Sequence, residues 1–447
     1  MHRPEDEPAP SIRRRRHLRT TAITIALGAV MFTVGAVGLS PPGAGTPGAA
    51  SSASPSAGPA RGIEALRERL KRLPKDPVGW ADLGMALVQQ ARTTADQATY
   101  AQAEKALRRS LGLQPAENLH AEIGMGALAA ARHEFRDAVT WARKAVATSP
   151  ATPASYGVLA DAHTQLGQYE EAQAAVQEMA DLRPDSSSLA RASYTFELRG
   201  DTVQAKALME RALRAAGTPG ERAFAHTHLS SLALDSGDPA TALRQAETGL
   251  AIAPRDAGLL EARAKARVAT GDRERAVADH TAAVATAPLP QYLLGLGELQ
   301  QSLGRQDRAE AQYAVLRAQE TLRRATGTPA DVDAIYFEAD HGDPRHAVVM
   351  AEAAVRERPF IAVHDAYAWA LHRAERDEEA LDQADEALAL GTRSALFLYH
   401  RGAIHQALGD TAAARRDLRQ ALALDPSFHP LHAPAAREAL RRIDDTP

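Results

Sequence analysis

The sequence predicts an all-α fold, a solenoid of about ten helix–turn–helix units. Three observations predict it. An alanine recurs at intervals of 33 to 38 residues along most of the chain. A glycine commonly stands five residues before this alanine, and a proline stands twelve residues after it. Aromatic residues make up only 4% of the 447 residues, which suits closely packed helices better than β-strands, because strands favour aromatic and β-branched side chains.

The chain begins with a segment that does not belong to the repeats. Residues 1–19 end in an arginine-rich run, whereas residues 20–60 contain no charged side chain. The apolar residues 22–39 would span about 27 Å as a helix, which is enough to cross the hydrocarbon core of a membrane. Because arginine stays on the cytoplasmic side, the sequence predicts a basic cytoplasmic N-terminus (residues 1–19) and a transmembrane helix at residues 20–40.

A cleaved signal segment is the alternative interpretation of residues 20–40. In both cases the rest of the chain lies outside the cytoplasm, either anchored in the cell membrane by a single span or secreted after cleavage. Only six of the 52 basic residues are lysine, a composition that favours a GC-rich bacterial source. We therefore expect a bacterial protein that contacts the membrane through its N-terminal helix.

A spacer follows the apolar segment. Residues 41–60 contain only proline, glycine, alanine, serine and threonine, so they cannot bury a hydrophobic core. A flexible chain of this length typically reaches about 25 Å. We expect this linker to hold the solenoid, residues 61–445, away from the membrane.

The recurring alanine defines the repeat. It predicts ten units, with this alanine at Ala103, Ala138, Ala172, Ala205, Ala242, Ala276, Ala309, Ala347, Ala380 and Ala414. Twelve residues earlier, most units have a small residue: Gly126, Ala160, Ser193, Ser230, Ala264, Gly297, Ala368 and Gly402. Ile335 is the exception. Two antiparallel helices approach closely only where side chains are small, so each such pair of positions marks a helix crossing.

Glycine and proline mark the ends of the helices. The chain reverses between the two helices of a unit, and a left-handed residue, usually glycine, closes the first helix. The glycines at this place are Gly167, Gly200, Gly237, Gly271, Gly304, Gly342 and Gly409. His133 and Glu375 replace the glycine in two other units. The proline then ends the second helix, because it cannot continue the helical hydrogen bonding.

Two further helices should close the ends of the stack. At the N-terminal end, residues 62–73 place Ile63, Leu66 and Leu70 on one apolar stripe. At the C-terminal end, residues 432–445 form a polar-backed helix, with Leu431, Ala435 and Leu440 expected to face inward. A solenoid needs such end helices because its terminal units would otherwise expose an apolar face.

This pattern resembles the tetratricopeptide repeat (TPR), whose units are about 34 residues long. The resemblance covers about residues 77–426 and implies a right-handed superhelix, an α-solenoid, with a concave groove that binds a protein or peptide. Three places depart from the pattern. The first unit implies a longer reversal loop at residues 91–97, and longer connections between units are expected near Pro219 and Pro329.

By this resemblance, the first helix of each unit supplies the side chains of the groove. The groove positions are Asp161, Thr164, Tyr194, Lys265, Gln291, Glu298, Gln301, Tyr336, Asp365, Trp369 and His372. The candidate binding residues among them are Asp161, Tyr194, Lys265, Glu298, Tyr336, Asp365, Trp369 and His372. Aromatic side chains beside charges are typical of binding hot spots, which favours the cluster around Trp369. The alternative is that Trp369 and Tyr336 pack between units.

Composition and motifs exclude several functions. The chain has no cysteine, which excludes disulfides, thiolate nucleophiles and cysteine-ligated zinc. A net charge of −4 provides no basic excess for nucleic acid. There is no P-loop, no nucleophile elbow and no His-Glu-x-x-His motif. His226, His228, His429 and His432 are better explained as surface or partly packed side chains than as metal ligands. We therefore expect no catalytic residue, no cofactor and no metal.

The hypothesis from sequence is a non-catalytic scaffold that presents a TPR groove to a protein or peptide and is tethered outside the cytoplasmic membrane. Three alternatives stay open at this point. A module for a small molecule or a cell-envelope glycan would need a closed aromatic pocket near Trp369. An architectural spacer would lack a distinctive patch in the groove. An enzyme would need a convergent cluster of perturbed titratable groups.

Overall fold

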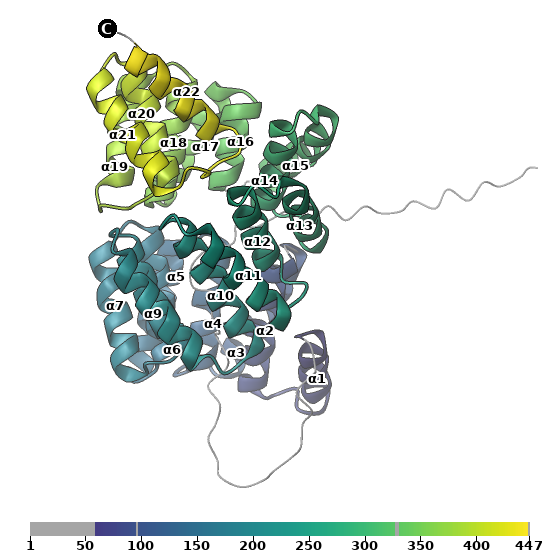
Figure 1. Ribbon diagram of the computed structural model, residues 1–447. Coiled ribbons are helices and arrows are strands. Elements are labelled where there is room, and N and C mark those ends of the chain that lie inside the picture. Colours follow the sequence, from purple (N-terminus) through teal and green to yellow (C-terminus); the bar gives the residue numbers. More distant parts are fainter. Residues whose placement is uncertain (1–58, 95–96, 327–329, 446–447) are drawn as a thin grey trace, which may run out of the picture.

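The computed structural model describes residues 59–445, except residues 95–96 and 327–329 (Figure 1). The predicted cytoplasmic N-terminus, the membrane or signal segment and nearly all of the linker lie outside the described residues. Among the helices that are described, none has the length and apolar character needed to cross a membrane.

The described residues form 22 α-helices, of which twenty pack as ten consecutive pairs. The first helices of the pairs are α2 (Pro77–Thr94), α4 (Leu119–Ala131), α6 (Pro153–Gln165), α8 (Ser186–Glu197), α10 (Pro219–Leu234), α12 (Ala257–Ala269), α14 (Pro290–Ser302), α16 (Val332–His341), α18 (Ile361–Arg373) and α20 (Ala395–Ala407). The second helices are α3 (Gln97–Leu113), α5 (Phe135–Thr148), α7 (Tyr169–Leu182), α9 (Thr202–Ala215), α11 (Pro239–Ile252), α13 (Arg273–Thr286), α15 (Gln306–Thr326), α17 (Pro344–Glu357), α19 (Asp377–Leu388) and α21 (Thr411–Leu424). The flanking helices are α1 (Pro59–Arg72) and α22 (His432–Asp445). The predicted ten-unit α-solenoid is confirmed.

The predicted helix crossings lie where the small residues recur. All ten recurring alanines are buried, with at most 5% of their surface exposed. The Ser193 hydroxyl donates a hydrogen bond to the Ala205 carbonyl oxygen at 2.6 Å, and Ser230 does the same to Ala242 at 2.9 Å. In these two units the small residue therefore touches the alanine that follows it by twelve positions, as the crossing model requires.

Enlarging one of these alanines should destabilise the fold. Ala276 is fully buried on α13, whereas Ala285 is exposed on the same helix. We expect Ala276→Leu to lower the free energy of unfolding by roughly 1–3 kcal/mol, because the larger side chain overpacks the crossing. Ala285→Leu is the matched control and should leave stability nearly unchanged. Chemical denaturation followed by circular dichroism measures both, and equal midpoints for the two variants would contradict the assigned register.

The turn glycines confirm the predicted chain reversals, with one correction. Six of them have positive φ, as a left-handed cap requires: Gly167, Gly200, Gly237, Gly271, Gly304 and Gly409. His133 (φ 64°) and Glu375 (φ 62°) adopt the same conformation in place of glycine. Gly342 does not, because its φ is −130°. Here α16 has only 10 residues, and it ends at Gly342 with φ −130° and ψ −135° instead of a left-handed residue.

The longer loops expected at residues 91–97 and near Pro219 are wrong, because helices occupy most of these residues instead. In the first unit, α2 continues to Thr94, so only residues 95–96 separate it from α3. Helix α10 begins at Pro219 itself, with Thr218 and Glu221 forming a capping box. Helix α15 extends over 21 residues, and the longer connection expected near Pro329 lies outside the described residues. A helix satisfies the backbone hydrogen bonds of added residues internally, whereas a longer loop leaves them to water.

The two end helices also form, but the inner face predicted for the second is partly wrong. In α1, Ile63 and Leu70 are buried against the first unit, as predicted. In α22 the buried residues are Ala433, Ala436, Ala439 and Ile443. Ala435, expected to face inward, is exposed. The inner stripe of α22 begins at Ala433 and repeats every three or four residues, so Ala435 falls on the outer face.

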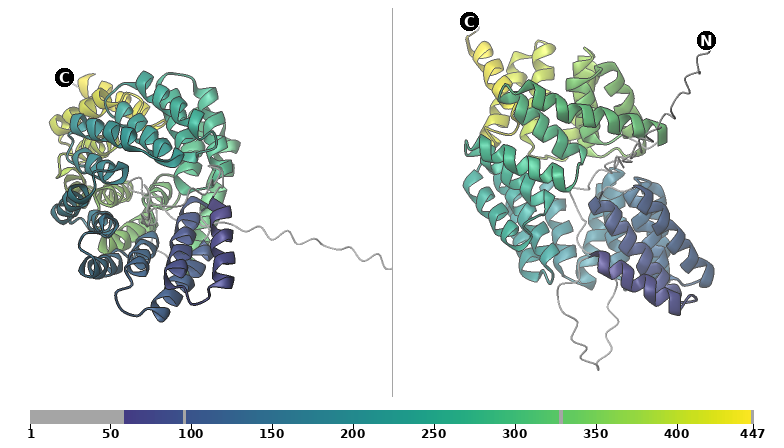
Figure 2. Two further views of the ribbon diagram at one scale, coloured as in Figure 1. Left: turned by 90° about the horizontal axis from the view of Figure 1, so that it is seen from below. Right: turned by 90° about the vertical axis from the view of Figure 1, so that its right-hand side faces the viewer.

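The solenoid curves so strongly that its end returns to its middle. Figures 1 and 2 show the helices winding around a common axis, with α17 to α22 lying beside α5 to α11. Tyr169, at the start of α7, accepts a hydrogen bond from the backbone N–H of Ile361 at 3.0 Å. Thr392 donates to the carbonyl oxygen of Leu198 at 2.5 Å. Unit three thus contacts the start of unit nine, and unit four contacts the segment after unit nine, although almost 200 residues separate the partners in sequence.

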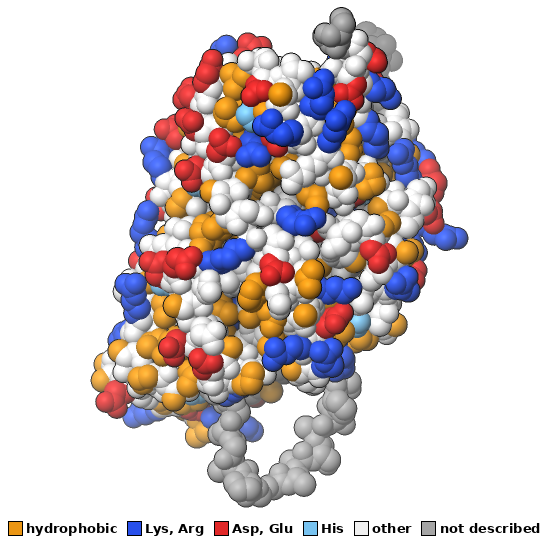
Figure 3. All heavy atoms as spheres, turned by 60° about the vertical axis from the view of Figure 1, so that its left-hand side comes forward, with side chains coloured by type: hydrophobic (Ala, Val, Ile, Leu, Met, Phe, Trp, Pro, Cys, Tyr) orange, Lys and Arg blue, Asp and Glu red, His pale blue; other side chains and the backbone are white. Residues whose placement is uncertain are grey.

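One outer face of the molecule carries mixed charges. In Figure 3, lysine and arginine side chains lie interspersed with aspartate and glutamate over this face. Elsewhere an ion pair joins the two turns of the solenoid, because Arg136 Nη1 lies 3.1 Å from Glu357 Oε2. Both partners are mostly exposed, so this ion pair contributes little stability by itself.

Candidate functional site

The first helices line the concave side of the solenoid. Neighbouring first helices contact each other directly along most of the stack, for example α2 with α4, α10 with α12, and α16 with α18. In a curved stack, the elements on the inner side lie closest together. The predicted groove positions all lie on these first helices, and the exposure of each side chain decides whether it reaches the inner surface.

Lys265 is the most accessible of the candidate residues. Its ammonium group lies 2.8 Å from Glu261, and 59% of its side chain is exposed. The negative charges of Glu261, Asp333 and Asp235 raise its pKa. These three carboxylates come from α12, α16 and the end of α10, so side chains of several units face one another across the inner surface.

Asp161 and Tyr194 are less available than the sequence suggested. Both oxygens of the Asp161 carboxylate accept hydrogen bonds from the Arg191 guanidinium, at 2.9 and 2.7 Å. Arg191 is itself buried, so this bidentate pair holds α6 against α8. Tyr194 is half-buried on α8, and burial raises the pKa of its hydroxyl. Thr164, Gln291 and Gln301 are likewise half-buried.

The inner surface also carries carboxylates that the sequence did not single out. Burial, together with the charge of Asp235, raises the pKa of Glu197 to about 8. Burial and Asp425 raise the pKa of Asp235 to about 7. For Asp333, burial and its neighbour Asp331 raise the pKa to about 7. Within the described residues, Glu197, Asp235 and Asp333 form no ion pair within 4 Å, and Lys265 offsets the charges of Asp235 and Asp333 only in part.

The cluster predicted as the strongest binding site does come together. The Tyr336 hydroxyl donates a 2.6 Å hydrogen bond to Asp365, and the ring centroids of Trp369 and His372 lie 5.1 Å apart. His372 in turn contacts Asp377 at 2.5 Å. The sequence therefore predicted correctly that these residues from α16 and α18 are neighbours.

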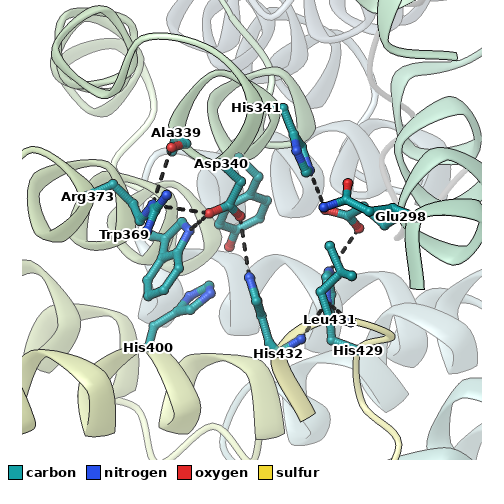
Figure 4. Close-up of polar contacts among 12 residues, drawn as sticks. Glu298, Ala339, Asp340, His341, Trp369, Arg373, His400, His429, Leu431 and His432 are labelled. Carbon is teal, nitrogen blue, oxygen red and sulfur yellow. Dashed lines mark hydrogen bonds and ion pairs between the residues drawn. The ribbon is translucent and has the colours of Figure 1, made fainter. Parts of the chain in front are cut away.

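Their accessibility was predicted wrongly. Trp369 is 3% exposed and Asp365 is fully buried, while Tyr336 and His372 are half-buried. The Trp369 indole N–H donates to Asp340 at 3.0 Å, and its ring stacks on His400 at a centroid distance of 4.2 Å (Figure 4). Trp369 packs between units, which was the alternative interpretation. It offers no exposed anchor to a partner in this conformation.

Glu298 is covered by residues from the C-terminal end. It is 5% exposed and lies between His341 Nε2, at 3.3 Å, and His429 Nε2, at 2.9 Å (Figure 4). Nearby, His432 Nε2 lies 3.4 Å from Asp340. His429 and His432 thus pack against the first helices α14 and α16, and His429 covers Glu298.

Several residues of this cluster were missed from the sequence. Asp340, His341 and His400 lie on first helices but outside the groove positions that the TPR resemblance gives. A usable signal existed for His400, because Arg191 and His400 both stand two residues before a small crossing residue and both point to a carboxylate of the preceding unit. His429 and His432 come from the loop and helix after the last repeat, and no repeat position describes them.

No metal centre is evident in the part of the chain that the structure describes. It holds no group of three or more histidine, aspartate or glutamate side chains arranged to bind a metal ion. The Glu298–His341–His429 contacts are therefore best described as hydrogen-bonded pairs.

Comparison with known proteins identifies the repeat unit but no curated relative of the whole chain. The Tetratricopeptide repeat family matches residues 153–186 and residues 395–428, which correspond to the third and the tenth unit. No curated protein matches the chain.

Solved structures similar to this chain are themselves repeat proteins. A thermophilic TPR protein from Thermus thermophilus is 23% identical, with a TM-score of 0.38, and the match covers 43% of this chain and 98% of that one. A tetratricopeptide repeat protein from Parabacteroides merdae is 18% identical, with a TM-score of 0.33, over 58% and 99% of the two chains. Yeast Tom70 is 14% identical, with a TM-score of 0.35, over 87% and 94%.

The family assignment depends on the two matched units and on the pattern they share with the other eight. Both matched units contain the small residue, the buried alanine and the helix pair that recur along the whole stack. Residues 153–186 and 395–428 are therefore tetratricopeptide repeats, within a TPR-like solenoid whose other units share their pattern.

Proposed function

We propose that this protein is a non-catalytic scaffold that binds a segment of another protein, or a peptide, along the inner surface formed by α8, α10, α12 and α16. The observation that carries the proposal is the set of inward-facing charges around Lys265. A preformed, charged concave surface supplies contacts without a large ordering cost. TPR proteins generally bind proteins or peptides, which agrees with this assignment.

The chemistry of this surface favours a partner that brings positive charge. Glu197, Asp235 and Asp333 have raised pKa values, and among the described residues Lys265 is a basic group near Asp235 and Asp333 that does not bring those values down to normal. A lysine or arginine side chain placed among them would lower those pKa values and would replace the missing counter-charge. We therefore propose that the bound segment contains basic residues.

We also propose that the scaffold acts outside the cytoplasm, held there by residues 20–40. This part of the proposal follows from the arginine-rich run before that apolar segment. The linker at residues 41–60 would then give the solenoid freedom to reach a partner near the membrane.

A site-specific crosslinking experiment tests the binding surface. A photoreactive amino acid at position 265, on the inner surface, should capture a partner in cells of the native source. The same amino acid in place of Glu247, an exposed residue of the second helix α11, is the matched control and should capture little. Mass spectrometry of the crosslinked product identifies the captured segment.

Two outcomes would count against the proposal. Equal capture at positions 265 and 247 would show that the inner surface is not selective. Capture of segments without lysine or arginine would leave the scaffold role standing but would reject the proposed charge complementarity.

A further inference from the structure

The C-terminal segment, defined here as residues 425–445, comprises the loop after α21 and helix α22. It does not simply extend the stack of units. Through His429 and His432 it reaches back to Glu298 on α14 and Asp340 on α16 (Figure 4). The segment thus connects the end of the tenth unit with the seventh and eighth.

This segment also covers the aromatic cluster. The His432 ring stacks on Tyr399 with a centroid distance of 4.9 Å and lies 5.2 Å from the ring of Trp369. Phe428 lies 5.6 Å from Tyr399. Burial of Trp369 therefore depends in part on the C-terminal segment staying in place.

The segment is held mostly by small and polar contacts. The buried residues of α22 are three alanines and one isoleucine. Alanine buries little apolar area, so this packing contributes less than a helix with large side chains would. The contacts of His429 with Glu298 and of His432 with Asp340 add to this packing and to the ion pairs that Asp444 forms with Arg415 and Arg419.

We propose that the C-terminal segment is a pH-sensitive latch, which covers the inner surface of units seven to ten near neutral pH and releases from it in mildly acidic solution. The inference concerns the segment itself and does not depend on whether the groove binds a partner.

His432 is the residue that would sense acid. The groups around it are Asp340 on α16, Arg373 on α18, Tyr399 and His400 on α20, and His429 of the segment itself. Burial and the neighbouring His429 lower the pKa of His432 to about 4. In a released segment, where solvent surrounds the ring, the pKa returns to its ordinary value of about 6.5.

The pKa of His429 is set by two opposing effects, burial and the charge of Glu298. It faces Glu298, which also contacts His341, and more distantly Asp340 and Lys265. Burial alone would lower the pKa of His429, but Glu298 outweighs it and raises the pKa. Its Nδ1 accepts the backbone N–H groups of Leu431 and His432, each at 3.2 Å, and these bonds favour the neutral ring. The docked segment therefore holds at most one proton on its two histidines.

The sign of the pH effect follows from this proton count. Because docking depresses the pKa of His432, its contribution is fully present above about pH 6.5 and is lost as pH falls toward 4. Because docking raises the pKa of His429, its contribution is present below about pH 6.5 and is lost as pH rises through the raised value. Between about pH 6.5 and pH 4 the released segment takes up two added protons and the docked segment at most one, so acid favours release in this range.

Hydrogen–deuterium exchange on the full chain tests the latch. The quantity to compare is the protection factor of the α22 amides, which is the exchange rate corrected for its intrinsic pH dependence. Between pH 7 and pH 5 we expect this protection to fall on the order of tenfold, from the depressed pKa of His432. Helix α1 at the opposite end serves as the internal control, because Ile63 and Leu70 hold it through apolar contacts.

Two variants separate the latch from general acid sensitivity. His432→Gln cannot titrate at this position, so the α22 protection should no longer fall at pH 5. The remaining histidine, His429, has a raised pKa and can only keep or increase the protection there. His405→Gln alters a histidine on α20 that faces Asp417, outside the segment, and should retain the pH response. The proposal is overturned by a pH-independent α22 in the unaltered protein, by equal loss of protection in α1, or by an undiminished response in His432→Gln. The first two outcomes need no variant, so a folding defect cannot mask them.

Discussion

Replacing Gly200 with alanine is expected to break the contact between the two turns of the solenoid and to lower the free energy of unfolding by roughly 2–4 kcal/mol. Gly200 has a φ of +75°, and a Cβ atom added there would lie 2.3 Å from the carbonyl oxygen of Gly391. The obstacle is backbone rather than a flexible side chain. The segment after unit nine must therefore move away from unit four, taking the Thr392–Leu198 hydrogen bond with it.

Other glycines of the same series provide the control for backbone strain. Gly409 has a φ of +82° in the equivalent turn, but a Cβ atom there would meet nothing within 4 Å. Gly409→Ala should cost only the left-handed strain, about 1 kcal/mol. Small-angle X-ray scattering separates the two variants further, since only Gly200→Ala should increase the radius of gyration. Identical denaturation midpoints and identical scattering would show that the turns do not hold each other.

The contact between turns also shows where the sequence stops being informative. Ser193 and Ala205 are twelve residues apart and share one helix pair, so a repeating pattern predicts their contact directly. Tyr169 and Ile361 meet only because small rotations between successive units accumulate until the superhelix closes on itself. The accumulated rotation cannot be inferred from any single unit. A repeat alignment therefore predicts the units but not the contact between the two turns of the solenoid.

For the candidate site too, the repeat pattern predicts some features and misses others. Lys265 is accessible, and its neighbours Glu261 and Asp333 lie on first helices, as the repeat positions imply. For Trp369 the repeat gives the correct neighbours in α16 and α18 but not what covers them. His400 and His432 close over the indole, and His432 belongs to a helix outside the repeat. Burial at a solenoid end depends on such additions, which have no periodic signal.

Replacing Trp369 with alanine is consequently expected to destabilise the protein itself. The indole is 3% exposed, stacks on His400 and donates a hydrogen bond to the buried Asp340. Removing a buried tryptophan leaves a cavity and takes one of two donors from Asp340 Oδ1, which keeps Arg373 at 3.3 Å, at a cost of about 3–5 kcal/mol. The loss should appear as a lower denaturation midpoint for the C-terminal units, measured by chemical denaturation with hydrogen exchange of α18 and α20.

Trp141 supplies the comparison that distinguishes packing from partner binding. It is half-buried on α5, with Lys144 5.3 Å from the centre of its ring. Because less apolar surface is removed, Trp141→Ala should cost clearly less than Trp369→Ala. If Trp369→Ala instead kept full stability and lost only partner capture, the indole would be exposed in the working state. The C-terminal segment would then have to be displaced whenever the partner binds, since Trp369 cannot be reached while His432 lies against it.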